Sequence, residues 1–88
     1  MWDETYRALA DPQRRALLKV LREGPQAAGD LGAHLAVAPS TLSHHLGQLK
    51  AAGLVRVEKR GTQRIYSINT SVIEDLTADL LSLRDAGK

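Results

Sequence analysis

The chain of 88 residues contains no cysteine. This absence excludes disulfide bonds, thiolate metal sites and a cysteine nucleophile, but it says nothing about the redox compartment. Long apolar runs are missing as well, because none approaches the roughly 20 residues that cross a membrane. The first residues also lack the basic start and apolar stretch of a secretion signal. We therefore expect a cytoplasmic protein with no membrane partner.

Net charge is also low, at +2. Many inert domains carry as much, so the total alone indicates no partner. The distribution of charge is more informative. Residues 50–64 hold five basic residues against one acid, Glu58, whereas residues 71–85 hold four acids against one basic residue, Arg84. Only the first of these segments suits a partner that carries phosphate.

The sequence does contain enough apolar residues, 43% of the total, for one compact core. A chain this short buries a low fraction of its surface, which makes a lone monomer marginally stable. There is no repeat, low-complexity segment or long linker. We therefore expect one domain over residues 1–88, helped by self-association.

Apolar residues at helical spacing predict four helices in the first part of the chain, at 1–10, 12–22, 29–36 and 39–52. Asp11 followed by Pro12 is a strong signal for the start of a helix. Gly53 is a typical glycine at a helix C-terminus. The third and fourth helices are separated by only a few residues, which predicts a tight turn between them.

The pattern changes to alternation from Leu54, so residues 54–68 are expected to form a β-hairpin that turns at Gly61. Ser71 with Glu74 fits a capping box ahead of a last helix over 71–85. The predicted fold class is α+β and mostly helical. Two short helices followed at once by a hairpin are typical of a winged helix-turn-helix, whose second helix enters the major groove of DNA.

The fourth helix has two different sides. At 100° per residue its leucines form one stripe, and Ser40, His44 and Gln48 point away from it. A face of short donors and acceptors without an acid favours nucleic acid over plain solvent. We predict DNA contacts from the following side chains: Ser40, Thr41, Ser43, His44, His45 and Gln48.

Two alternatives stay open for this helix. Ser40 and Thr41 could bind phosphate or could instead cap the helix, and His45 could reach DNA or fill a gap in the core with equal weight. His44 and Gln48 are expected to reach base edges.

The hairpin tip is the second predicted contact with DNA. Lys59, Arg60, Gln63 and Arg64 surround the turn and would contact phosphate or an adjacent minor groove. A charged tip also protects an exposed strand edge, which explains one or two of these residues but not all four. The basic residues of the second helix are expected mainly to form a solvated face, although Arg14 or Arg15 could contact a DNA backbone phosphate.

Several stretches carry a resemblance to a known family: Ala10-Asp11-Pro12-Gln13-Arg14-Arg15, Gly29-Asp30-Leu31, Ser40-Thr41-Leu42-Ser43-His44-His45-Leu46, Ala52-Gly53-Leu54-Val55, the Gly61 turn and Tyr66. Together they resemble the ArsR/SmtB family of winged-helix repressors over nearly the whole chain. The stretch from Ile68 to Val72 resembles the SdpR-type autorepressor branch of that family.

The resemblance implies a homodimer on double-stranded operator DNA, with the first and last helices, 1–10 and 71–85, as the dimer interface. The candidates for that interface are Trp2, Tyr6, Leu9, Leu76, Leu80 and Leu83. Some of them could close the monomer core instead, and for Leu76 this alternative is nearly as strong.

Many relatives sense metals, and the resemblance implies where the ligands would be. The cysteine positions of the third helix correspond to Ala27 and Gly29, which cannot ligate, and the acids of the last helix, Glu74, Asp75 and Asp79, have no histidine beside them. His44 and His45 point about 100° apart, and His34 stands alone. We expect a repressor with no metal and no cofactor, released by an unidentified protein or small-molecule effector or by none.

A winged-helix adaptor that binds protein and no DNA is the alternative to the repressor. An enzyme is not expected, since the sequence has no His-Glu-x-x-His helix, no phosphate-binding glycine loop and no serine at a strand-to-helix elbow.

Overall fold

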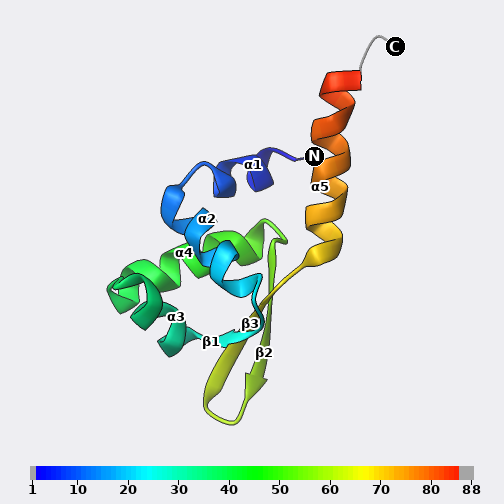
Figure 1. The fold of residues 1–88 in the computed structure, drawn as a ribbon. Helices are drawn as coiled ribbons and strands as arrows, with labels where there is room; N and C mark the ends of the chain where they lie inside the picture. The colour runs from blue at the N-terminus through cyan, green and yellow to red at the C-terminus, as the bar shows by residue number, and fades with distance from the viewer. Residues whose placement is uncertain (1, 86–88) are drawn as a thin grey trace.

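The computed structural model describes residues 2–85. The elements follow in the order α1 (Asp3–Leu9), α2 (Pro12–Leu21), β1 (Gln26–Ala27), α3 (Ala28–Leu35), α4 (Pro39–Ala51), β2 (Val55–Arg60), β3 (Gln63–Ile68) and α5 (Thr70–Asp85) (Figure 1). Met1, which the predicted first helix includes, and residues 86–88 lie outside the described residues. The predicted fold class, α+β and mostly helical, is confirmed.

The start of α2 is fixed by its cap. Asp11 is extended, and its Oδ1 accepts hydrogen bonds from the backbone N–H of Gln13 at 2.8 Å and of Arg14 at 3.2 Å. Pro12 occupies the first turn, where no N–H is needed. Partial burial raises the pKa of Asp11, but the two backbone N–H groups and the nearby positive charge of Arg14 lower it more, so the net pKa lies below its ordinary value.

The sheet has three strands within the described residues, one more than predicted. Its order is β1-β3-β2, all antiparallel, with Gln26 opposite Tyr66 on one side and Val57 opposite Tyr66 on the other. β1 was missed because two residues are too few to show an alternating pattern. It ties the connection between α2 and α3 to the hairpin. The predicted turn is confirmed: Gly61 has φ +61°, which suits the first position of a two-residue loop.

The turn between α3 and α4 depends on one residue in a left-handed conformation. Ala36 has φ 51° and ψ 44°, and its N–H bonds the carbonyl of Gly32. Glycine is the usual residue at this position of a helix end, because a Cβ is strained there. The turn directs the chain from α3 straight into Pro39, the first residue of α4.

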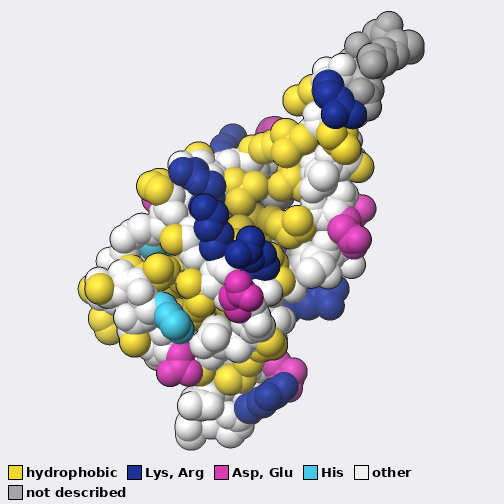
Figure 2. Space-filling view, in the orientation of Figure 1, with side chains coloured by type: hydrophobic (Ala, Val, Ile, Leu, Met, Phe, Trp, Pro, Cys, Tyr) yellow, Lys and Arg dark blue, Asp and Glu magenta, His cyan; other side chains and the backbone are white. Residues whose placement is uncertain are grey.

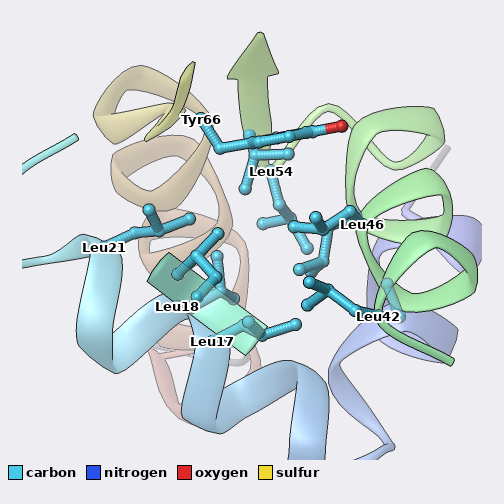
Figure 3. Close-up of a cluster of buried hydrophobic side chains, with 11 residues drawn as sticks. Leu17, Leu18, Leu21, Leu42, Leu46, Leu54 and Tyr66 are labelled. Carbon is cyan, nitrogen blue, oxygen red and sulfur yellow. The ribbon is translucent and has the colours of Figure 1, made fainter. Parts of the chain in front are cut away.

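The core lies where α2, α3 and α4 meet the hairpin. Leu17, Leu18 and Leu21 of α2 face Leu42 and Leu46 of α4 (Figure 3). Five leucines of this core are almost fully buried: Leu17, Leu21, Leu31, Leu49 and Leu54. Burying a leucine stabilises a fold by roughly 1.5–3 kcal/mol, so this cluster holds α4 with one fixed face inward.

The last helix begins one residue earlier than predicted. Since α5 starts at Thr70, Ser71 lies inside its first turn, and no Ser71–Glu74 capping pair forms among the described residues. Asn69 anchors this point instead: its Nδ2 donates to the carbonyl of Gly53 at 3.0 Å, and its N–H donates to Leu54. The base of α5 is thus tied to the end of α4.

α5 leaves the body after its first turns. Val72 and Ile73 pack against the core and Leu76 is buried, but the far half of the helix projects beyond α1 (Figure 1). The described residues extend 51 × 22 × 21 Å with a radius of gyration of 14.0 Å, against about 12 Å for a compact domain of this length. No helix in the described part of the chain is both long and apolar enough to span a bilayer.

Candidate nucleic-acid interface

The outer face of α4 is exposed as predicted. Ser40, His44 and Gln48 are exposed, and Thr41 and Ser43 are exposed on the flanks of this face. The leucines of the same helix are buried, which fixes the direction in which the polar side chains point. α4 contains no acidic residue, so nothing on the helix itself repels phosphate.

The first turn of α4 has no side-chain cap. Its N-cap residue is Ala38, and no side chain within residues 2–85 accepts from the backbone N–H groups there. Ser40 and Thr41 therefore do not cap the helix, which was the alternative interpretation of these two hydroxyl groups. Free N–H groups at a helix start, together with the helix dipole, attract anions.

His45 is not at the surface, and the prediction that it contacts DNA is wrong. It is only 6% exposed. Its Nε2 lies 2.8 Å from Gln13 Oε1 and its Nδ1 lies 3.3 Å from Arg14 Nη1. Because a guanidinium can only donate, Nδ1 accepts and Nε2 carries the proton. The imidazole therefore joins α4 to α2 and fills the core, the second of the two roles weighed for it.

Arg14 and Arg15 have structural partners. Arg14 donates from Nε to the carbonyl of Ala8 at 2.7 Å and from Nη2 to that of Arg7 at 3.2 Å. Arg15 donates to the carbonyl of Leu9 at 2.6 Å. Both side chains thus satisfy carbonyls at the C-terminus of α1, where positive charge also suits the helix dipole. They hold α1 in place rather than forming a free basic face.

The four polar residues of the hairpin tip divide between its two faces. Lys59 is opposite Arg64, and Arg60 is opposite Gln63. Side chains alternate along a strand, so the two pairs point to opposite faces. Arg60 Nε bonds Glu58 Oε1 at 2.9 Å in an exposed ion pair. The hydrogen bond from Arg60, and then its charge, lowers the pKa of Glu58. Lys59 and Arg64 have no acidic partner among residues 2–85.

A groove of about 440 Å³ separates α4 from the hairpin. Its α4 wall includes Ser43, Gly47 and Lys50, and its hairpin wall includes Lys59, Arg64 and Tyr66. Sequence reasoning did not select Gly47, Lys50 or Tyr66. The signal was available for two of them, because 100° steps place Gly47 and Lys50 on the same flank of the helix as Ser43.

The interface candidates of α1 and α5 divide into exposed and buried residues. Leu80 is 48% and Leu83 73% exposed, Tyr6 is exposed, and Trp2 and Leu9 are partly buried. Figure 2 shows apolar side chains gathered along α5 and the adjoining surface. Leu76 is 5% exposed and buried within the protomer, so assigning it to a dimer interface is wrong.

On the surface formed by α1 and α5, the sequence did not predict the exposure of Leu81 or the hydrogen bond between Tyr6 and Asp79. Leu81 is also exposed, on another side of α5. The Tyr6 hydroxyl donates to Asp79 Oδ2 at 2.8 Å and fastens α1 to α5. This hydrogen bond, then burial and the carboxylate charge, raises the pKa of Tyr6.

The positions where metal-sensing relatives carry ligands do not fit a metal here. Ala27 and Gly29 offer no donor atom, and Asp79 accepts the Tyr6 hydroxyl. Among residues 2–85, no three side chains of the ligating types gather around a common point. No step of the function is therefore assigned to a metal ion.

A helix-turn-helix whose second helix shows an acid-free polar face beside a basic hairpin defines a winged helix-turn-helix DNA-binding protein. Residues 11–57 match the family model described as bacterial regulatory protein, arsR family. The chain belongs to this family and is a transcriptional regulator, not an enzyme.

Individual relatives agree with this assignment. The chain is 33% identical over 85 residues to the transcriptional repressor SdpR of Bacillus subtilis, covering 97% of this chain and 94% of the relative. An ArsR-like transcriptional regulator from Rhodococcus superposes with a TM-score of 0.85 at 27% identity, covering 93% of this chain and 77% of that one. A homodimeric winged helix-turn-helix DNA-binding domain from Mycobacterium bovis gives a TM-score of 0.77 at 27% identity, covering 96% and 78%. None of these relatives supports the adaptor function.

Proposed function

We propose that this chain is a homodimeric transcriptional repressor. It reads a near-palindromic operator with α4 and contacts the DNA backbone with the β2–β3 hairpin. His44 and Gln48 contact base edges in the major groove. Ser40, Thr41 and Ser43 bind phosphate beside them, and Lys59, Arg60, Gln63 and Arg64 form the wing. Acting on DNA, the protein works in the cytoplasm.

One observation carries this proposal: the polar side chains on the side of α4 opposite its leucines are hydroxyls, an imidazole and an amide, and the helix contains no acid. An ordinary solvated helix favours Glu, Lys and Gln because they form helices well. The five leucine side chains below the face hold it rigidly: Leu17, Leu31, Leu42, Leu46 and Leu49. A rigid face places donors more accurately than a loop does.

The proposed dimer uses α1 and the free half of α5. Leu80 and Leu83 continue the stripe that Val72, Ile73 and Leu76 turn toward the body, because all five lie on one side of the helix at 100° per residue. Half of that stripe is covered within the protomer and half is exposed. A second copy would cover the exposed half, and the homodimeric state of one structural relative supports a dimer. Trp2, Tyr6 and Leu9 complete the surface.

The proposed repressor has no metal sensor, and its release depends on another effector or on none. Its resemblance to an autorepressor branch makes its own promoter the first candidate operator. A two-fold dimer predicts an inverted repeat with half-sites about 34 Å apart, one turn of DNA, or a multiple of that distance.

Fluorescence anisotropy with DNA from upstream of its own gene tests this proposal. We expect specific binding at moderate salt that weakens steeply as salt rises, with a slope of roughly −0.9 for each phosphate contact in a log–log plot. A folded dimer that binds this DNA no better than a scrambled duplex would contradict autoregulation. Failure against every fragment of a genomic selection would contradict DNA reading itself.

A further inference from the structure

We propose that the groove between α4 and the hairpin is a seat for one backbone phosphate of DNA, and that the Tyr66 hydroxyl is the hydrogen-bond donor within it. This inference rests on the proposed function and deepens it. It adds three residues to the interface, Gly47, Lys50 and Tyr66, and gives each a separate task.

The hydroxyl of Tyr66 is placed to donate a hydrogen bond within the groove. Tyr66 is 8% exposed, in the central strand of the sheet, and its ring extends toward α4 with the hydroxyl at the far end (Figure 3). That hydroxyl forms no hydrogen bond to any group in residues 2–85, although it lines the groove. The hydroxyl is not among the described side-chain atoms that are both sealed from solvent and without a partner, so it is open to the groove and free to donate there. An acceptor that enters the groove from outside would accept a hydrogen bond from this hydroxyl.

The charges around the groove favour an anionic acceptor. Lys50, Lys59 and Arg64 line it together, and no acid from the described part of the chain does. Lys59 and Arg64 are directly opposite each other on neighbouring strands, and like charges in that position destabilise a sheet. None of the three forms an ion pair with another described residue. A phosphate between them would remove the repulsion.

Gly47 leaves space for this phosphate. A Cβ added to Gly47 would meet no atom within 4 Å, so the packing of the protomer does not require glycine there. Glycine inside a helix nevertheless costs about 1 kcal/mol relative to alanine. A groove of about 440 Å³ admits a phosphate with its sugar, and the bare backbone at Gly47 lets it come close to α4.

The position of the groove indicates DNA rather than a free anion as the source of the phosphate. The groove lies between the helix proposed to enter the major groove and the hairpin proposed to follow the backbone, and the cationic side chains on its walls are exposed. A DNA strand that contacted both elements would pass through it. Inorganic phosphate offers the same acceptor oxygens without these additional contacts.

The first test compares two substitutions in the intact protein on its selected operator. Tyr66→Phe should weaken binding about tenfold by removing a hydrogen bond to a charged group. It should leave the thermal midpoint and the salt slope unchanged, because no internal bond and no charge is lost. Gly47→Ala should raise the thermal midpoint and yet weaken binding at least tenfold. Thr77→Val and Ser82→Ala on α5 are matched controls and should leave binding unchanged.

The second test places a neutral methylphosphonate at each backbone position of the operator in turn. The unsubstituted protein should lose about tenfold in affinity at one position in each half-site, and Tyr66→Phe should be insensitive at that same position. Equal binding by Tyr66→Phe and the unsubstituted protein would overturn the seat. A second result would also overturn it: millimolar inorganic phosphate stabilises the unsubstituted protein but not Tyr66→Phe, while Tyr66→Phe binds DNA normally. The groove would then bind a free anion and not a DNA phosphate. Absence of specific binding by the unsubstituted protein would instead overturn the proposed function.

Discussion

At the residue scale, two adjacent histidines have opposite surroundings. His44 is exposed on the outer face of α4, whereas His45 is buried and bonded to Gln13 and Arg14. Their rings are 5.7 Å apart between centroids. The 100° step of a helix is enough to separate an imidazole that faces solvent from one that holds two helices together. A pair of identical side chains thus serves two purposes.

Replacing each of the two histidines by alanine should separate these purposes. His45→Ala leaves the partners on α2 unsatisfied and opens a cavity, so it should reduce the free energy of unfolding by about 2–3 kcal/mol. His44→Ala should change it by less than about 0.5 kcal/mol, as surface substitutions do. Urea denaturation of the two variants checks this, and an equal loss in both would contradict the assigned surroundings.

Asp11 predicts a pH dependence of stability. Its pKa is lowered in the folded state from an ordinary value of 3.8. A lowered pKa means that its stabilising contribution is complete above that value and is lost as the pH falls through the folded-state pKa. Asp11→Ala should therefore be less stable than the unsubstituted protein at pH 7, and the difference should shrink below pH 4.

Asp11→Asn is the control for this effect. Asparagine caps a helix about as well as aspartate but carries no charge, so this variant should retain more stability at pH 7 than Asp11→Ala. Denaturant midpoints at pH 7 and pH 3 measure both differences. A gap between the unsubstituted protein and Asp11→Ala that stayed constant with pH would contradict the role of the ionised cap.

At the element scale, how far sequence predicts structure depends on how long the pattern is. Three leucines at helical spacing between Pro39 and Gly53 were enough to place α4 and its outward face. β1 has only two residues, so only its pairing with β3 in the folded chain defines it. The groove was also beyond sequence reasoning, because it arises from the distance between α4 and the hairpin rather than from either element alone.

The turn between α3 and α4 offers a direct test of an element boundary. Ala36 adopts φ 51°, where alanine is strained and glycine is not. Ala36→Gly should therefore stabilise the protein by about 0.5–1 kcal/mol, even though glycine usually destabilises by increasing the freedom of the unfolded chain. The midpoint of thermal or urea unfolding checks it. A loss of stability would contradict the left-handed turn.

At the scale of the whole molecule, the hairpin and the free end of α5 lie at opposite ends of a 51 Å axis (Figure 1). The surface proposed to contact DNA and the surface proposed to contact a second copy are therefore well separated. The apolar stripe of α5 was predictable from its spacing, but the point at which the stripe leaves the body was not. That point follows from the bonds that Asn69 and Tyr6 make with distant parts of the chain.

Leu83 tests the proposed dimer. It is 73% exposed, so Leu83→Glu should leave the protomer folded while placing a charge in the apolar contact between copies. Light scattering should then report a monomer. Ala78→Glu is the matched control, because Ala78 is exposed on the opposite side of α5 and should leave the dimer intact. A dimer that persists in Leu83→Glu would contradict this interface.

The claim that α4 reads bases is tested most directly by operator variants with single base-pair changes. The unsubstituted protein should discriminate by about 1–3 kcal/mol at the positions that His44 and Gln48 contact. His44→Ala and Gln48→Ala should each lose that discrimination at one position in every half-site and retain it elsewhere. If both variants discriminate at every position as the unsubstituted protein does, the exposed face of α4 does not read the operator.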